Sequence, residues 1–185
     1  MIIGITGTIG AGKGTVVDYL VKQKGFKHYS VRDFLTDEII KRGLPVNRDS
    51  MREVGNDLRR KGVLITIILY EKAVALGGNA IVESMRSLRE VVELKKRPGF
   101  YLFAVDADIK LRYERVIKRA SETDKVSFEK FVEQENSEMY DKDPSGMNIK
   151  GCMEQADYLL TNNGAPEELY RQVDAAMADI STTIP

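Results

Sequence analysis

One stretch near the start of the chain restricts its fold more than any other: a glycine-rich run after a short apolar segment. The apolar segment is residues 2–6, and the run is Gly7-Thr8-Ile9-Gly10-Ala11-Gly12-Lys13-Gly14-Thr15. A helical pattern follows, with apolar residues on one face at Val16, Val17, Leu20 and Val21. A strand, a glycine loop and a helix in this order form the context that a phosphate-binding loop requires.

The composition of the loop suits the binding of an anion. Its glycines let successive backbone N–H groups point inward as an anion nest. The helix predicted from Lys13 adds the positive end of its dipole, and the Lys13 ammonium adds a full charge. The alternative is a glycine-rich turn with a chance lysine. We expect a polyphosphate to be bound by the loop residues Gly7, Thr8, Gly10, Ala11, Gly12, Lys13, Gly14 and Thr15.

The end of this loop resembles that of adenylate kinase and related nucleoside monophosphate kinases. In the general pattern GxxxxGK[ST], a hydroxyl directly after the lysine binds magnesium. Here Gly14 holds that position and the hydroxyl follows at Thr15. The resemblance implies ATP and Mg²⁺ as cofactors, with the metal held largely through water and phosphate oxygens.

Length and composition are those of a single globular domain spanning residues 1–185, with 43% hydrophobic residues. Lys and Arg number 28, as do Asp and Glu, so we expect neither nucleic acid nor a membrane surface as a partner. One cysteine and one histidine exclude a disulfide framework and a multi-cysteine zinc site.

The apolar run at residues 63–70 is shorter than the roughly 18 residues that span a bilayer. Because residues 1–6 lack the features of a secretion signal, we expect a cytoplasmic location. The sequence does not indicate an oligomeric state.

Short β-rich runs alternate with helical stretches along the chain. We predict strands at residues 2–6, 27–30, 80–83, 100–105 and 158–160, and helices from residue 13 and at 33–42, 51–58, 63–75, 88–92, 109–120 and 166–180. Residues 63–70 are also compatible with a strand. The alternation predicts an α/β fold with a five-stranded parallel sheet covered on both faces. With the resemblance, it implies a three-layer P-loop kinase fold with a short lid, whose ligands bind beyond the carboxyl ends of the strands.

A charged pair, Arg32 and Asp33, follows the second predicted strand. This place resembles the start of the acceptor-binding helix in monophosphate kinases and the aspartate after the second strand of dephospho-coenzyme A kinases. The resemblance implies that Asp33 accepts a proton or hydrogen bond, that Arg32 faces a phosphate, and that the acceptor region covers about residues 30–76. The alternative is that Ser30 or Asp33 only caps a helix.

An acid and an arginine, Glu83 and Arg86, follow the third predicted strand. Kinases of the resembled family commonly have an acidic residue here near magnesium or the acceptor, and an arginine that clamps the acceptor's phosphate. A guanidinium suits that role because its planar donors match phosphate oxygens. Glu83 stands where adenylate kinases carry Asp, and no proline precedes Arg86. The alternative is a surface arginine at the start of a helix.

Three arginines follow the fourth predicted strand at helical spacing: Arg112, Arg115 and Arg119. They fall within roughly 60° of one another, away from the apolar side formed by Ile109, Tyr113, Val116, Ile117 and Ala120. They resemble the lid arginines of nucleotide kinases, which neutralise charge on the transferred phosphoryl group. A lid is expected at about residues 112–130, with a short polar segment at 121–127. The alternative is a solvated helix face.

The fifth predicted strand ends in Thr161-Asn162-Asn163-Gly164. Related kinases use this loop to contact the adenine edge, which implies a weak role for Asn163 in cofactor binding. Asn-Gly is also a common turn pair. His28 and Cys152 are interpreted as structural residues.

Together these motifs resemble the nucleoside monophosphate kinase and dephospho-coenzyme A kinase superfamily over nearly the whole chain. The resemblance implies transfer of the γ-phosphate of ATP to a nucleoside or deoxynucleoside monophosphate, with a small molecule as partner. Catalytic roles are implied for Lys13, Asp33, Arg86, Arg115 and Arg119, substrate binding for Arg32, Asp33, Glu83 and Arg86, and a water-mediated metal contact for Glu83. Dephospho-coenzyme A kinase is the rival, favoured by Asp33 and the 156–164 ending but opposed by Gly14, where that family has serine. An ATP-binding regulatory module without catalysis is the further alternative.

Overall fold

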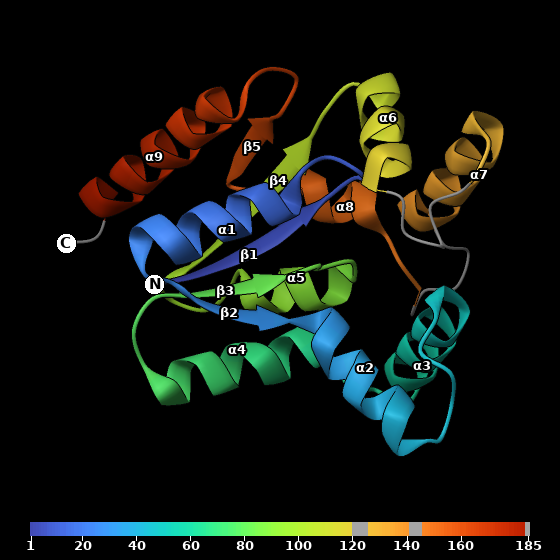
Figure 1. Cartoon of the computed structure of the whole chain (residues 1–185). Coiled ribbons are helices and arrows are strands. Elements are labelled where there is room, and N and C mark those ends of the chain that lie inside the picture. Colours follow the sequence, from blue (N-terminus) through green and yellow to red (C-terminus); the bar gives the residue numbers. More distant parts are fainter. Residues whose placement is uncertain (120–125, 141–145, 184–185) are drawn as a thin grey trace.

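The computed structural model describes residues 1–119, 126–140 and 146–183 (Figure 1). Within these residues a parallel five-stranded sheet has the strand order β2-β3-β1-β4-β5. The strands are β1 (Ile2–Gly7), β2 (Lys27–Ser30), β3 (Ala80–Glu83), β4 (Phe100–Asp106) and β5 (Tyr158–Thr161). The central strand β1 pairs with β3 on one side and β4 on the other. The predicted fold class is confirmed, because this is the α/β arrangement of a P-loop kinase.

Helices connect the strands and cover both faces of the sheet. The described helices are α1 (Lys13–Lys24), α2 (Val31–Lys41), α3 (Arg48–Arg60), α4 (Ile65–Leu76), α5 (Leu88–Leu94), α6 (Ile109–Arg119), α7 (Phe128–Met139), α8 (Ile149–Glu154) and α9 (Pro166–Thr183). The sequence did not predict α7 and α8. Among the described segments, every helix is too short or too polar to cross a membrane.

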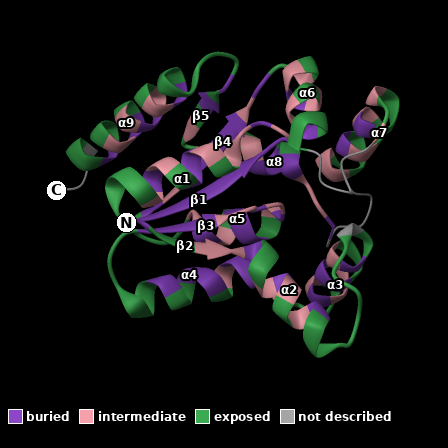
Figure 2. Ribbon diagram, in the orientation of Figure 1, coloured by how far each residue is buried: buried purple, intermediate pink, exposed green. Residues whose placement is uncertain are grey.

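The core has two parts, one on each face of the sheet. Alternation along β1 separates them, since Ile3 and Ile5 face one part and Ile2 faces the other. The Ile3 face is covered by α1 and α9, and the Ile2 face by α2, α3, α4, α5 and α8. Figure 2 shows the inner strands β1, β3 and β4 as largely buried, whereas the edge strands β2 and β5 are partly exposed. Helices on both faces leave the carboxyl-terminal edge of the sheet as the place for a ligand.

Two ambiguous segments are resolved by the structure. Residues 63–75, which also fitted a strand, form α4, with Ile65, Leu69 and Ala73 buried at a spacing of four residues. The helix predicted from residue 33 begins at Val31, because the Ser30 side chain caps it by accepting a hydrogen bond from the Asp33 amide at 3.1 Å. Ser30 therefore has the capping role that was the alternative reading of this segment.

The predicted apolar face of α6 is wrong in part. Val116 is buried as expected, whereas Ile117 is 40% exposed. Adjacent positions on a helix differ by about 100°, so one of two neighbouring apolar residues faces outward. Ala120, predicted for the same face of α6, lies outside the described residues.

A pair of substitutions in neighbouring strands tests this packing. Phe103 in β4 is fully buried, whereas Leu159 in β5 is 62% exposed. We expect Phe103→Ala to lower the free energy of unfolding by about 3–5 kcal/mol, because it leaves a cavity between β4 and its covering helices. Leu159→Ala should change it by less than about 0.5 kcal/mol. Urea denaturation of both variants is the measurement, and equal losses would contradict the described sheet register.

Candidate active site

The phosphate-loop sequence forms a tight turn between β1 and α1. Gly7 and Gly12 have φ angles of 136° and 97°, which residues with a Cβ atom rarely adopt. A Cβ atom on Gly12 would lie 2.2 Å from Nδ2 of Asn162, and one on Gly7 would lie 2.0 Å from the carbonyl oxygen of Val105. Both glycines are therefore needed for the backbone conformation and for close approach to β4 and the loop after β5.

Lys13 lies across this loop. Its Nζ atom donates hydrogen bonds to the carbonyl oxygens of Gly7 at 2.9 Å and Thr8 at 2.7 Å. Burial, and next the positive charge of Arg86, lower the pKa of Lys13 to about 8, while Glu83 and Glu138 act in the opposite direction. Lys13 therefore interacts electrostatically with Glu83 and Arg86, which the sequence had assigned to the acceptor side.

Side chains from the ends of β4 and β5 hold the loop from outside. Thr8 donates a hydrogen bond from Oγ1 to Oδ1 of Asp106 at 2.6 Å. The buried Asn162 donates from Nδ2 to the carbonyl oxygen of Ala11 at 2.8 Å. Asn163, which the sequence had assigned to the cofactor, is exposed and accepts a hydrogen bond from the Asp108 amide at 2.7 Å. The residue of this pair that touches the loop is Asn162, which sequence reasoning missed.

The arginine stripe of α6 does not form one free face. Arg112 is 5% exposed and forms a bidentate ion pair with Glu135 of α7, with Nη2 to Oε1 at 2.9 Å. Its Nη1 atom also donates to the carbonyl oxygen of Ile9 in the loop at 3.1 Å. The prediction that Arg112 belongs to a lid face is therefore wrong, because long-range acceptors on α7 and the loop draw this arginine inward.

The other two arginines of the stripe differ in exposure. Arg115 is half-buried and Arg119 is exposed. Within the described part of the chain, the Nη1 atom of Arg115 is buried without a hydrogen-bond partner. A buried guanidinium donor without an acceptor fits an anionic ligand. The predicted lid region includes most of α6 and the start of α7, and its residues 120–125 lie outside the described chain.

Glu83, at the end of β3, pairs with a histidine from the neighbouring strand. Nε2 of His28 lies 3.0 Å from Oε2 of Glu83. This contact raises the pKa of His28 and lowers the pKa of Glu83, to which the charges of Lys13 and Arg86 also contribute. The negative charge of Asp33 raises the pKa of His28 further, so the second and third predicted site segments meet at His28.

The turn after β3 positions Arg86. Ser84 has a φ of 68°, a conformation that costs a residue with a side chain about 1–3 kcal/mol. The hydroxyl of Thr6 donates a hydrogen bond to the carbonyl oxygen of Met85 at 2.7 Å, which fixes the turn to β1. Arg86 donates from Nη1 to Oε2 of Glu138 in α7 at 2.6 Å. The structure thus brings Lys13, Glu83 and Arg86 together.

The predicted residues of the second segment, Arg32 and Asp33, are exposed in the first turn of α2. In the described residues, no three acidic, histidine or cysteine side chains converge on a point that could hold a metal. Glu83 provides a single carboxylate, which fits a Mg²⁺ ion that keeps waters and binds mainly through substrate phosphates.

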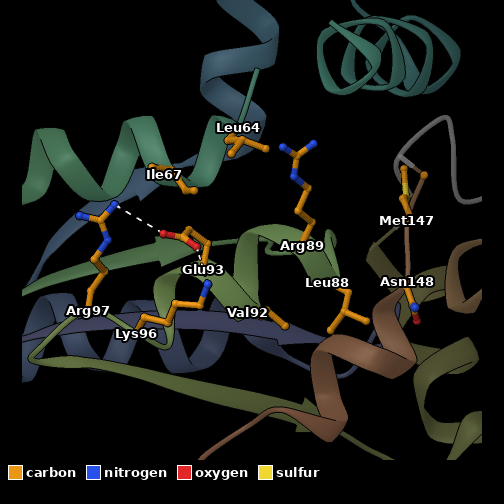
Figure 3. Close-up of a pocket in the computed structure, with 11 residues that line it drawn as sticks. Leu64, Ile67, Leu88, Arg89, Val92, Glu93, Lys96, Arg97, Met147 and Asn148 are labelled. Atoms are coloured by element: carbon orange, nitrogen blue, oxygen red, sulfur yellow. Dashed lines mark hydrogen bonds and ion pairs between the residues drawn. The ribbon is translucent and has the colours of Figure 1, made fainter. Parts of the chain in front are cut away.

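Two surface grooves border this region. One, of about 680 Å³, is lined by the loop residues Gly14 and Thr15 together with Tyr19 and Tyr170, whose rings stack at 4.3 Å. The other, of about 730 Å³, runs along the outer side of α5 between Leu64 and Met147 (Figure 3). None of the sequence-predicted site residues lines this second groove.

Comparisons with known proteins agree with the geometry. The AAA domain family profile matches residues 3–143. A UPF0200 protein of Thermococcus kodakarensis is 30% identical over 97% of this chain and 98% of its own length. A UPF0200 protein of Methanothermobacter thermautotrophicus is 31% identical over 93% of this chain and 86% of its own.

Solved structures share the fold. The structure of TT1252 from Thermus thermophilus has a TM-score of 0.61 and 25% identity, and 97% of each chain is covered. Shikimate kinase from Bacteroides thetaiotaomicron has a TM-score of 0.59 and 11% identity over 98% of each chain. A gluconokinase from Sinorhizobium meliloti has a TM-score of 0.53 and 13% identity over 98% of this chain and 94% of that one.

A pair of glycine substitutions tests the loop conformation. We expect Gly12→Ala to lower the free energy of unfolding by about 1–3 kcal/mol, because its φ is 97° and a Cβ atom would collide with Asn162. Gly14 has open space around its Cα atom and lies in the first turn of α1, so Gly14→Ala should be neutral or stabilising by up to about 1 kcal/mol. Thermal unfolding compares them, and equal effects would argue against this loop geometry.

The pKa of Lys13 leads to a second prediction. A bound diphosphate favours the charged ammonium and raises the pKa of Lys13 above its value of about 8 in the free protein. We therefore expect ADP binding at about pH 8.5 to take up a proton, and ADP affinity to fall as the pH rises through the pKa of Lys13. Calorimetry in two buffers of different ionisation enthalpy measures the uptake. Lys13→Met should abolish it, and an uptake that persists in this variant rules out Lys13 as its source.

Proposed function

We propose a function that starts from one established fact: this chain belongs to the AAA domain family, whose profile matches residues 3–143. On the P-loop kinase fold of this chain, we propose ATP-dependent transfer of a phosphoryl group to a small-molecule acceptor. The observation that carries the proposal is the position of Lys13, whose Nζ atom lies on the glycine loop and whose pKa is influenced by the charges of Arg86 and Glu83. Phosphoryl transfer needs little covalent chemistry from the protein and depends on positioning and charge.

The proposed roles at the donor side follow from the contacts of the loop. Lys13 and the loop amides bind the β- and γ-phosphates of ATP. Mg²⁺, when bound to these phosphates, neutralises part of their charge, and Glu83 offers it a water-mediated contact. The buried Nη1 atom of Arg115 supports a contact with the transferred phosphoryl group, and Arg119 is placed one helical turn further along α6.

We propose a nucleoside or deoxynucleoside monophosphate as the leading acceptor, whose phosphate Arg86 and Arg32 would bind. A phosphate acceptor needs arginine donors rather than a base. The position of Arg86 beside Lys13 supports this choice, because an arginine there holds the acceptor phosphate close to the donor.

A second acceptor class is favoured by Asp33. Its negative charge raises the pKa of His28, the residue that pairs with Glu83. A carboxylate at this place suits an acceptor hydroxyl, from which it accepts the proton. Dephospho-coenzyme A has such a hydroxyl, and two solved structures with this fold are named as shikimate kinase and gluconokinase. We further propose that the protein has no nucleic acid or membrane partner, which the equal numbers of basic and acidic residues, 28 each, support. We also propose a cytoplasmic location.

An acceptor panel tests this proposal. We expect the protein with Mg·ATP to phosphorylate at least one nucleoside monophosphate or dephospho-coenzyme A. Lys13→Met should lower the turnover by about 100-fold or more, because it removes the positive charge that stabilises the transferred phosphoryl group. Coupled ADP release, confirmed by mass spectrometry of the product, is the measurement.

The panel also separates the acceptor classes. Asp33→Asn should reduce transfer to a hydroxyl by about 100-fold or more and leave transfer to a monophosphate nearly unchanged. The exposed Asp37→Asn on the same helix is the matched control. If Mg·ATP binds but no acceptor in the panel is phosphorylated, the protein is a nucleotide-binding module and not a kinase of these classes.

A further inference from the structure

Helix α7 carries two carboxylates that pair with arginines near the phosphate loop. Glu135 and Glu138 are three residues apart, so they lie on the same side of the helix. Glu135 pairs with Arg112 of α6, and Glu138 pairs with Arg86 after β3. The sequence did not predict α7, and none of the predicted site residues belongs to its described length.

The pair between Glu135 and Arg112 is part of a contact set that engages all three guanidinium nitrogens of the arginine. Both side chains are buried, with 11% and 6% exposure. Arg112 directs Nη1 and Nη2 to Glu135, donates from Nε to the carbonyl oxygen of Ala107 at 2.8 Å, and donates from Nη1 to that of Ile9 at 3.1 Å. Because Ile9 belongs to the loop, this pair braces the loop against α7.

The pair between Glu138 and Arg86 is built differently. Arg86 is about one-third exposed and donates to Glu138 through the single atom Nη1 at 2.6 Å. Within the described chain, its Nε and Nη2 atoms donate no hydrogen bond. Arg86 also has the largest effect of any charge on the pKa of Lys13. Its guanidinium therefore lies where a phosphate held by Lys13 would compete with Glu138 for it.

We propose that Glu135 and Glu138 are positioning residues of the phosphate site with opposite effects on anion binding. Glu135 acts through Arg112 and keeps the loop in its binding conformation. Glu138 occupies Arg86, and a bound polyphosphate displaces it, because two neighbouring anions repel each other and a phosphate offers the arginine more acceptor atoms. This inference rests on the proposed polyphosphate site and adds a control of its affinity by α7.

Calorimetric titration with inorganic pyrophosphate at neutral pH tests the inference on the whole chain. We expect Glu138→Gln to bind pyrophosphate about 5- to 10-fold more tightly than the unmodified protein, because it removes the competing charge. Glu135→Gln should bind it about 5- to 10-fold more weakly, because the brace on Ile9 is loosened. The matched control is Glu133→Gln on the same helix, whose target side chain is 70% exposed and pairs with the exposed Lys130. It should bind pyrophosphate as the unmodified protein does.

The outcomes separate this inference from the proposed function. Unchanged or weaker binding by Glu138→Gln overturns the competition, and unchanged or tighter binding by Glu135→Gln overturns the brace. If Glu135→Gln fails to fold by circular dichroism, Glu135→Asp replaces it and should also weaken binding. Opposite shifts with no phosphoryl transfer to any acceptor would support the inference and remove the kinase proposal. If neither the unmodified protein nor a variant binds pyrophosphate, both are wrong.

Discussion

The site depends on hydrogen bonds that hold a flexible glycine loop from outside. Glycines give the loop its turn, but they also leave it with the most backbone entropy to lose on folding. Arg112 and Asn162 fix two of its carbonyl groups, those of Ile9 and Ala11. Thr8 adds a third contact, to Asp106. The side chains that hold the loop from outside are Asp106 at the end of β4, Asn162 after β5 and Arg112 in α6. The order of the parallel strands therefore determines the shape of the loop.

Charge balance is the second property of this site. Lys13, Arg86 and Arg112 are opposed by Glu83, Glu138 and Glu135, so the cluster carries about as much negative as positive charge. Burial makes a lone charge costly, which explains why each arginine has a carboxylate close to it. It also explains the pKa of about 8 at Lys13, where burial and Arg86 act against the charged form. Such a cluster favours a ligand that can replace a carboxylate, as a phosphate does.

The sequence predicted the features that depend on local patterns. The β1–loop–α1 unit, the other four strands and most helices follow from short-range periodicity and glycine placement. The contacts of Arg112 could not be predicted in this way, because an arginine is usually exposed and its partner Glu135 lies 23 positions away. Helix α7 was missed because it is mostly polar, with Phe131 its only buried hydrophobic residue. Asn162 and Asn163 are indistinguishable by type, and only the direction of the chain after β5 turns Asn162 toward the loop.

The central claim is that main-chain N–H groups of the loop and Lys13 bind a polyphosphate. The most direct measurement is a titration of ¹⁵N-labelled protein with Mg·ADP, followed by the amide resonances of Gly10, Gly12 and Lys13. We predict large downfield shifts of these resonances, as hydrogen bonds to phosphate oxygens form, while the amide of the remote turn residue Gly62 stays unchanged. If the loop amides do not move at saturating Mg·ADP, or if the nucleotide shifts only resonances elsewhere, the account is contradicted.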